Sequence, residues 1–338
     1  MAVTIWDIAK HLELSVSTVS RALNGYGDVA SKTRQRVFDA ARELGYYPSS
    51  TARNLRRGRT DKIGLLINTS ITYMSQYLSE VFPGATIAAE KQGYNLVFYT
   101  AGVNRPDELM RVCRAREVDG VILLWAGEIE NAIAFLQKEG LPFVLFDGRV
   151  DDPNVSYIAA DNLAGALSLM RHLLELGHRR IGFTARPELG ATSSDRLAGY
   201  RQALEEAGIP VDESLIISTV IEPRSGYYAA NDLLNLAKPP TAIFAIHDTV
   251  AVDAFQAVTE RGLRVPEDVA IAGFDGFLSS LTTQPPLTTV KLPLSEMGQL
   301  AVETLLAQAS DPSRPPTRIK MPVRLLVRQS TVGELTGG

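Results

Sequence analysis

The sequence has few of the residues and segments that mark secreted, metal-binding or membrane proteins. Cys113 is the one cysteine among 338 residues, which excludes an intrachain disulfide and a cysteine-based zinc site, and we expect it to be small buried filler. No apolar run approaches the roughly 18 residues that cross a bilayer. Asp7, Lys10 and Glu13 interrupt the start of the chain, where an export signal needs an apolar core. We therefore expect a cytoplasmic protein with no membrane partner, no metal and no cofactor.

The motifs of common enzyme classes are also missing. There is no GxSxG elbow, no HExxH and no P-loop, and the Gly25-Tyr-Gly27 fragment lacks the third glycine of a dinucleotide fingerprint. Carboxylates in a cleft can still hydrolyse glycosides, so a glycosidase is one alternative. A periplasmic transport receptor is another, which the absence of an export signal disfavours.

Charge is divided unevenly along the chain. The formal net charge is -4, yet residues 1–60 hold ten Lys/Arg against five Asp/Glu, whereas residues 61–338 hold 24 against 33. A basic head on an acidic body confines favourable contact with phosphate to one end. The length exceeds that of a single core, so we expect a small domain followed by a larger, two-lobed one.

Three short helices are predicted in the head. Thr4 is a natural N-cap for a helix to about His11 and Ser15 for residues 16–23, and Ser31 opens a third helix to about Leu44. The first two, joined by a tight turn, make a helix-turn-helix. The segment SSTARNLRRGR that follows has only Ala52 and Leu55 as apolar contacts, so we expect it to be helical only when something binds it.

From Ile63 onward, short β-rich runs alternate with amphipathic stretches. The runs are IGLLI, NLVFY, GVILL, FVLF, RIGFT, TAIFAI and VAIAGF. This alternation is typical of βαβ units around buried parallel sheets, and two sheets are needed to hold all the runs. We expect a break near Asp152-Pro153, and a tail that crosses back between the lobes through LTTVK, LSEMGQLAVETLLAQ and MPVRLLV.

Several stretches together resemble the lactose-repressor (LacI/GalR) family of bacterial transcription regulators. They are TIWDIAKHLELSVSTVSRALNG, TRQRVFDAARELGYYP, ARNLRRGRTDKIGLL, RLAGYRQAL, ERGLRVPEDVAIAGFDG and the Asp161-Asn162 pair. The resemblance implies an α/β chain with a helix-turn-helix domain, a hinge helix, and a two-lobed, periplasmic-binding-protein-like (type I) core of parallel sheets flanked by helices. The implied limits are 1–48 for the head, 49–61 for the hinge helix and linker, 62–160 with about 291–320 for the N-terminal lobe, and 161–290 with about 321–332 for the C-terminal lobe. The implied partners are palindromic operator DNA, a second copy of the chain, and a small-molecule effector that we expect to be a mono- or disaccharide.

The candidate DNA-reading residues lie early in the second helix, which enters the major groove of DNA in a helix-turn-helix. Arg21 is the side chain best shaped for the O6 and N7 acceptors of guanine, Val16 suits a thymine methyl group, and Ser17 makes a less selective hydrogen bond. Short polar side chains suited to phosphate are Thr4, Ser15, Thr18, Ser20, Asn24 and Thr33. Helix capping is an alternative for Ser15 and Thr33, and a surface ion pair is an alternative for Arg21.

The predicted hinge helix places one large apolar residue, Leu55, among four arginines. That combination suits a wedge that unstacks a minor-groove step while the arginines hold phosphate. In the family two such helices meet at the operator centre, and Ala52 fits as the small residue that lets them approach.

Candidate effector-binding residues follow the strand runs, because ligands bind at the C-terminal ends of parallel strands. They are Trp125, Asp147, Asp248 and Asp275, with Arg196 at the start of RLAGYRQAL and with Tyr73, Thr192 and Glu222 as secondary candidates. Carboxylates, a guanidinium and an aromatic face form the set that a sugar demands. The resemblance places Arg196, Asp248 and Asp275 on the family's effector positions.

Simpler interpretations of the same residues remain open. Asp248 and Asp275 could N-cap the helices that follow them, and Trp125 could be packing between the lobes. His247 stands where the family often has Asn. Gly190 stands where purine-sensing relatives place an Arg, which disfavours a purine effector.

Overall fold

The chain forms two compact units, Met1–Thr60 and Asp61–Gly338. The structure is a computed structural model that describes residues 3–46, 59–67, 71–100, 106–124, 129–187, 190–220 and 222–332, without the side chains of 71–74 and 106–108. The predicted hinge contacts Ala52 and Leu55, the Trp125 candidate and the side chain of Tyr73 therefore lie outside the described residues.

In the described part of the first unit, three helices surround a small apolar core. They are α1 (Ile5–Leu12), α2 (Val16–Leu23) and α3 (Ser31–Glu43). Ile8, Val19 and Val37 are fully buried where the helices meet. The N-cap of α2 is Ser15, whose hydroxyl accepts from the backbone N–H of Thr18 at 3.1 Å. The three predicted helices are confirmed.

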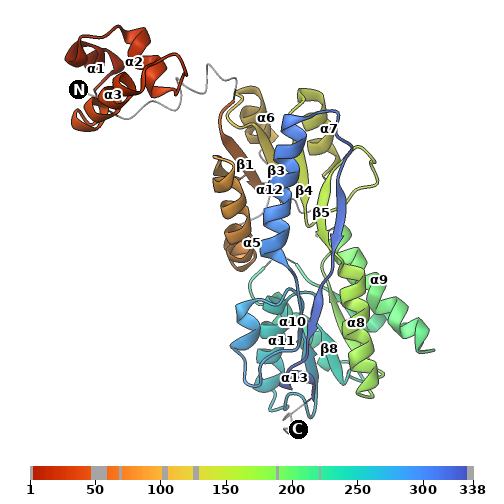
Figure 1. The fold of residues 1–338 in the computed structure, drawn as a ribbon. Coiled ribbons are helices and arrows are strands. Elements are labelled where there is room, and N and C mark those ends of the chain that lie inside the picture. The colour runs from red at the N-terminus through yellow and green to blue at the C-terminus, as the bar shows by residue number, and fades with distance from the viewer. Residues whose placement is uncertain are drawn as a thin grey trace. The chain divides into compact units, whose positions relative to one another are not determined.

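The second unit begins with a sheet whose described strands all pair in parallel. Their order is β11-β5-β4-β3-β1-β2. Their bounds are β1 Lys62–Ile67, β2 Asn95–Thr100, β3 Gly120–Leu124, β4 Phe143–Phe146, β5 Tyr157–Ala160 and β11 Arg318–Met321. The helices that cover it are α5 (Ile71–Lys91), α6 (Pro106–Arg114), α7 (Glu130–Glu139) and α12 (Leu294–Ser310), and α12 lies beside α5 (Figure 1). We call these elements the first lobe.

A second parallel sheet has the order β7-β6-β8-β9 among the described strands. The strands are β6 Ile181–Ala185, β7 Ile216–Ser218, β8 Ala242–Phe244 and β9 Ala270–Ala272. Its helices are α8 (Asn162–Glu175), α9 (Ala191–Glu206), α10 (Ser225–Leu234) and α11 (Asp248–Glu260), with the short turns η2 (Glu213–Leu215) and η3 (Leu278–Leu281). We call these elements the second lobe.

The chain passes between the lobes three times. It leaves the first sheet after β5 for α8, returns after β10 (Thr289–Lys291) to α12 and β11, and leaves again to β12 (Arg324–Leu326) and α13 (Gln329–Val332). β10 and β12 pair antiparallel. The run MPVRLLV, expected as one strand, is divided between the end of β11 and β12, and no run in the sequence predicted β5 or β7.

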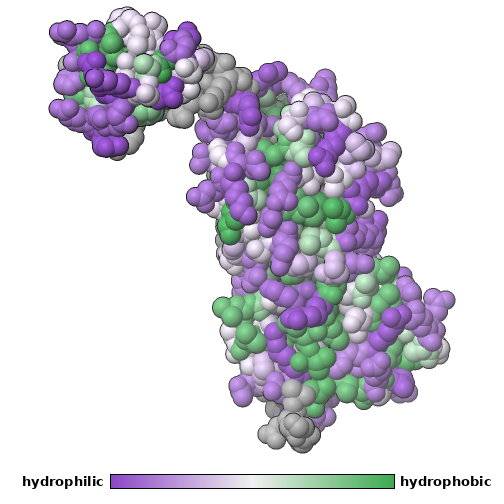
Figure 2. Space-filling view, viewed as in Figure 1, coloured by the Kyte–Doolittle hydropathy of each residue, from purple (hydrophilic) through white to green (hydrophobic). Residues whose placement is uncertain are grey.

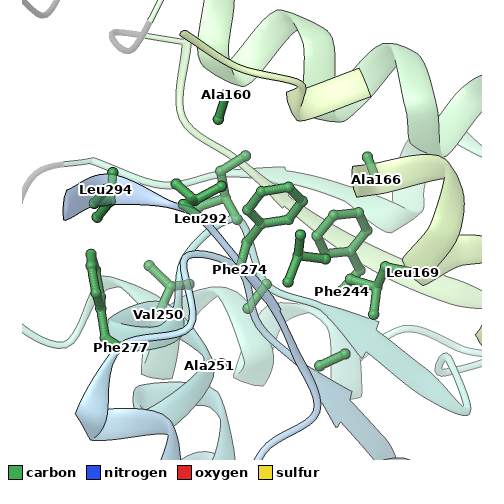
Figure 3. Packing of buried hydrophobic residues seen from close by; sticks show 14 of the residues in the cluster. Ala160, Ala166, Leu169, Phe244, Val250, Ala251, Phe274, Phe277, Leu292 and Leu294 are labelled. Carbon is green, nitrogen blue, oxygen red and sulfur yellow. The ribbon is translucent and has the colours of Figure 1, made fainter. Parts of the chain in front are cut away.

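Packing beside these crossings is tight and apolar. The rings of Phe244 and Phe274 stack with centroids 6.2 Å apart, and Leu292 lies beside them (Figure 3). Cys113 is buried, as expected. Within the described residues, no helix is long and apolar enough to cross a membrane.

Gly199 allows the close approach of α9 to α8. A Cβ at this position would lie 2.6 Å from the Ala166 Cβ and 2.9 Å from the Leu163 carbonyl oxygen. We expect Gly199→Ala to destabilise the chain by about 1–3 kcal/mol, because backbone atoms must move to relieve the clash. The midpoint of thermal unfolding should fall by about 2–4 °C for each kcal/mol. Gly148→Ala is the control, since its nearest neighbour would be 4.0 Å away; equal midpoints for both variants would contradict the close packing.

Candidate functional site

Polar side chains gather where strands of the two sheets end. Asp147 directly follows β4 in the first lobe, whereas His247 and Asp275 come shortly after β8 and β9 in the second. The C-terminal ends of adjacent parallel strands share one edge of a sheet, which brings the last two together. Arg196 joins them from α9.

Arg196 is a charged side chain that is only 1% exposed. Its Nη2 donates to Asp275 Oδ1 at 2.9 Å, its Nε to Asn162 Oδ1 at 2.9 Å, and its Nη1 to the Ile246 carbonyl at 2.5 Å. The guanidinium carbon also lies 3.8 Å from the centroid of the Phe274 ring. A buried charge needs such full pairing, and here one guanidinium ties together α8, α9 and the ends of β8 and β9.

Asp275 is held between two basic groups. Its Oδ1 accepts from Arg196, and its Oδ2 lies 2.8 Å from His247 Nδ1. Burial opposes ionisation, but Arg196 and His247 outweigh it and hold the pKa of Asp275 below its ordinary value. Asp275 is therefore a carboxylate at neutral pH, and it has a φ of 105°, a backbone conformation that is strained for a residue with a side chain.

The hydrogen bond to Asp275 determines which nitrogen of His247 carries the proton. Burial lowers the pKa of His247 despite the nearby carboxylate, so the ring is neutral at neutral pH. Nδ1 also lies 3.1 Å from Arg196 Nη1, which can only donate, but its shorter contact is with a carboxylate, which can only accept. The proton therefore belongs on Nδ1, and Nε2 is left as an acceptor. The His247 side chain is 16% exposed, so it is the most accessible member of this network.

Asp147 is the carboxyl group that the first lobe brings to the same place. Its Oδ2 accepts from the Tyr77 hydroxyl at 3.0 Å, and its Oδ1 accepts from the Ala160 backbone N–H at 3.2 Å. Burial raises the pKa of Asp147 to about 6, although Arg196 acts in the opposite direction. Arg196 and Asp275 of the second lobe both act on this pKa, so Asp147 lies within electrostatic range of them.

Direct contacts join the lobes around these residues. Arg149 makes a bidentate ion pair with Asp195 of α9, at 2.6 and 3.1 Å. The Thr192 hydroxyl donates to the Asp147 carbonyl at 2.9 Å, which brings this secondary candidate next to a primary one. Lys291 of β10 donates to Glu80 of α5 at 2.8 Å.

Asp248 is completely buried, and both of its carboxyl oxygens form hydrogen bonds within the protein. Its Oδ1 accepts from the Thr289 hydroxyl and its Oδ2 from the Phe277 backbone N–H, both at 2.6 Å. Burial raises its pKa to about 8, with a further contribution from Asp275. The capping alternative is wrong for Asp248, because α11 begins at this residue and its N-cap is His247. It is also wrong for Asp275, because the following turn, η3, has Phe277 as its N-cap.

One predicted position lies outside this cluster, and some residues that were not predicted belong to it. The Glu222 side chain is exposed, and the structure shows no contact that brings it to the cluster in the described part of the chain. Tyr77, Asn162 and Phe274 were not predicted as site residues. Tyr77 lies one helical turn after the candidate Tyr73, and Asn162 belongs to the Asp-Asn pair of the sequence, so both carried a weak signal. Across the described residues, no group of three or more His, Cys, Asp or Glu side chains could hold a metal ion.

The head presents the predicted DNA-reading residues on one helix. Ser17 and Arg21 are exposed and lie four residues apart on the same face of α2, while Val16, Thr18 and Ser20 are half-buried. Arg21 forms an ion pair with Asp28, which confirms the surface-pair alternative for this structure.

The short polar residues of the head make local contacts. The Ser15 hydroxyl caps α2, as its alternative interpretation held, whereas the N-cap of α3 is Ala30 and not Thr33. The Thr4 hydroxyl donates to the Asp7 carboxylate at 2.7 Å, and the Asn24 amide donates to the Ser20 carbonyl at 2.6 Å. Contact of these residues with DNA stays a prediction.

Both units match known protein families. Residues 4–49 match the family described as bacterial regulatory proteins, lacI family, and residues 170–331 match the periplasmic binding protein-like domain. The chain is 33% identical over 317 residues to the ribose operon repressor of Haemophilus influenzae, covering 92% of this chain and 93% of that relative. It is 34% identical over 331 residues to the HTH-type transcriptional repressor PurR of Escherichia coli O1:K1, covering 97% and 96%.

Solved structures of transcription regulators are also similar to this chain. A lac repressor dimer bound to operator and the anti-inducer ONPF has a TM-score of 0.86 at 27% identity, covering 98% of this chain and 99% of that one. A complex of the transcriptional regulator CelR with cellobiose has a TM-score of 0.76 at 30% identity, covering 97% and 99%.

The buried Asp248 predicts a pH dependence of stability. Its folded-state pKa of about 8 lies above the ordinary 3.8, so the stability that it contributes is full below pH 3.8 and is lost as the pH rises through 8. Asp248→Asn keeps the shape of the protonated acid and cannot ionise. We expect the variant's midpoint of thermal unfolding, relative to the parent's, to rise between about pH 5 and about pH 9. A difference that stays constant would mean that Asp248 titrates near its ordinary value.

Proposed function

The chain belongs to the lacI family of bacterial regulatory proteins, and we propose that it is a transcription repressor that binds a palindromic operator as a homodimer and releases it when a sugar binds between its lobes. The relatives are named as repressors, which removes the glycosidase alternative. We place the protein in the cytoplasm, on the nucleoid. The observation that carries the sugar assignment is the joint site of Asp147 and the Arg196–Asp275–His247 network.

Operator binding is assigned to the exposed face of α2 and to the hinge. Arg21 and Ser17 would meet base edges, with Val16 on a thymine methyl group. Phosphate contacts are assigned to Thr4, Ser15, Thr18, Ser20, Asn24 and Thr33, whose short side chains carry hydroxyl or amide donors. Leu55 and Ala52 would act in the minor groove at the operator centre.

Homodimer formation is supported by apolar side chains on the surface of the second lobe. Leu278 and Leu281 of η3 are 73% and 52% exposed, and Tyr228 of α10 is 60% exposed. Hydrophobic residues gather on the visible face of this lobe (Figure 2). A twofold dimer would cover such a patch with its own copy, and it would match the twofold symmetry of a palindromic operator.

The chemistry of the site suits a ligand rich in hydroxyl groups. His247 Nε2 is an acceptor at neutral pH. Each oxygen of the Asp147 carboxylate accepts one hydrogen bond from the described residues, which leaves further lone pairs for a ligand. Hydroxyl donors would satisfy both. Arg196 and Asp275 fix the position of His247, and their direct contact with the sugar stays a prediction because both are nearly inaccessible in this arrangement. Stacking by Trp125 or Tyr73, and contacts from Thr192 and Glu222, complete the proposal.

Named structural relatives support a sugar over other effectors. Besides the cellobiose complex, a lacI-family regulator from Enterococcus faecium binds ribose and has a TM-score of 0.70 at 28% identity. Because relatives named PurR also match, a purine is the alternative effector. Gly190, at the N-cap of α9, has no side chain to hold one at the position where purine-sensing relatives place an Arg.

Coupling between sugar and operator would run through the contacts that join the lobes. A ligand held by Asp147 in one lobe and His247 in the other must favour one spacing of the Arg149–Asp195 and Lys291–Glu80 pairs. The ligand acts only through its different affinities for the arrangement of the lobes that binds the operator and the arrangement that releases it. The direction that we propose is release.

The first test is an operator titration with and without sugar. A thermal-shift screen of mono- and disaccharides, with ribose, cellobiose and a purine base included, identifies the ligand, since a ligand at 100 times its dissociation constant adds about 2.7 kcal/mol. We expect that ligand to weaken operator binding by about 5- to 150-fold. Two chains should bind each palindromic duplex. Unchanged operator affinity in saturating ligand, or one chain per duplex, would overturn the switch or the dimer respectively.

The second test is the pH profile of sugar binding. Asp147 accepts hydroxyl protons at both of its oxygens, with the strength of a charged acceptor, only while it is ionised, so parent affinity should fall as the pH drops below 6, where this carboxyl gains its proton. Asp147→Asn should bind more weakly at about pH 7.5, by about 1–3 kcal/mol, and should lose the part of the pH dependence that Asp147 causes. Glu205→Gln, which removes an exposed carboxylate of α9, is the control. Calorimetry that shows parent-like affinity and pH profile in Asp147→Asn would place the sugar elsewhere.

A further inference from the structure

The geometry points to Asp28 as a positioning residue that holds Arg21 ready for guanine and sets how strongly the head discriminates operator from random DNA. This inference rests on the proposed function, because it requires that α2 reads base edges. The residue lies in the loop between α2 and α3, outside the helix that carries the reading residues.

Two side chains of that loop hold the Arg21 guanidinium. Asp28 Oδ2 pairs with Arg21 Nη2, and the Tyr26 ring centroid lies 5.2 Å from the guanidinium carbon. Arg21 and Asp28 are each about half exposed, at 50% and 53%. The pair is therefore accessible to DNA.

The loop itself is fixed by backbone contacts. The Tyr26 N–H donates to the Arg21 carbonyl at 3.1 Å, and Arg34 of α3 donates through Nη2 to the Tyr26 carbonyl at 2.6 Å. Gly25 takes the left-handed conformation, φ 77°, that turns the chain out of α2. Asp28 is consequently presented to Arg21 from an anchored backbone rather than from a free loop.

A carboxylate at this place affects the two kinds of DNA differently. Guanine offers two acceptors that take two N–H groups of one guanidinium, and a guanidinium already held in place loses less conformational freedom when it binds them. Phosphate can also take two N–H groups of Arg21, but it lies beside every base pair and carries no sequence information. When Arg21 turns away from Asp28 to a phosphate, it leaves Asp28 unpaired beside a polyanion. Asp28 therefore weakens binding to random DNA more than binding to the operator.

The simpler interpretation is an ordinary exposed ion pair, worth about 0–1 kcal/mol. Removing its negative charge would then strengthen binding to all DNA by one common factor. The ratio of operator affinity to random-DNA affinity distinguishes the two interpretations, because only a positioning role changes it.

The test measures this ratio for Asp28→Asn in the full chain. The operator is a duplex that the parent selects from a random-sequence library, and the competitor is a random duplex of equal length. We expect affinity for the random duplex to rise about three- to five-fold, the size of one exposed charge contact, while operator affinity stays level or falls. Preference at the guanine that Arg21 reads should relax.

Asp39→Asn is the matched control. It removes the same charge from the same unit, but Asp39 contacts Gln35 at 3.1 Å and Arg42 at 4.0 Å on α3. It should shift both affinities by one factor. An Asp28→Asn ratio equal to those of Asp39→Asn and the parent would overturn the inference.

Two further variants keep the outcomes separate. If the parent selects no preferred duplex, the proposed function itself fails. If Arg21→Ala loses discrimination while Asp28→Asn retains it, only the role of Asp28 fails. Asp28→Glu restores the charge on a longer side chain and should recover part of the ratio; no recovery in a variant with a parent-like circular dichroism spectrum would also count against positioning.

Discussion

The second lobe depends on one buried ion pair, Arg196 with Asp275. A guanidinium and a carboxylate lose several kcal/mol of hydration each when they leave water, and only full pairing makes that tolerable. Asn162, the Ile246 carbonyl and the face of Phe274 complete the pairing of Arg196. These partners come from separate segments, so every one of those segments must be in its final place before the charge is stabilised. The pair therefore fixes the geometry of the strand ends more strictly than apolar packing alone would.

That fixed geometry determines the chemistry of its neighbours. Asp275 can be ionised only because Arg196 and His247 face it, and its ionisation in turn places the proton of His247 on Nδ1. Asp248, without a basic partner in hydrogen-bond contact among those described, has its pKa raised to about 8 and acts as a neutral connection between Phe277 and Thr289. Two carboxyl groups near each other thus have opposite protonation states because their partners differ.

Much of this could be predicted from the sequence, and the failures have physical causes. The head helices were predictable because Ser15 is a local start signal and Gly45 a local stop signal, and the long strands because their apolar runs are continuous. β5 and β7 were not, since they are only four and three residues long and depend on neighbouring strands. Capping was a reasonable expectation for Asp248 and Asp275, but long-range partners, which no local pattern reveals, decided their roles.

The two arginines proposed to meet ligands each have an aspartate partner, and burial separates their roles. Arg196 and Asp275 are almost inaccessible, so breaking their contact would leave an uncompensated buried charge. This pair therefore has a structural role. Arg21 and Asp28 are half exposed, so their attraction is weak, and a base edge can reach the N–H groups of Arg21 that Asp28 does not use. The same chemical pair is thus closed to further partners in the core and open to them on the head. A regulator needs both properties, because its sensing site must keep one geometry while its DNA-reading side chains must remain accessible to a base edge.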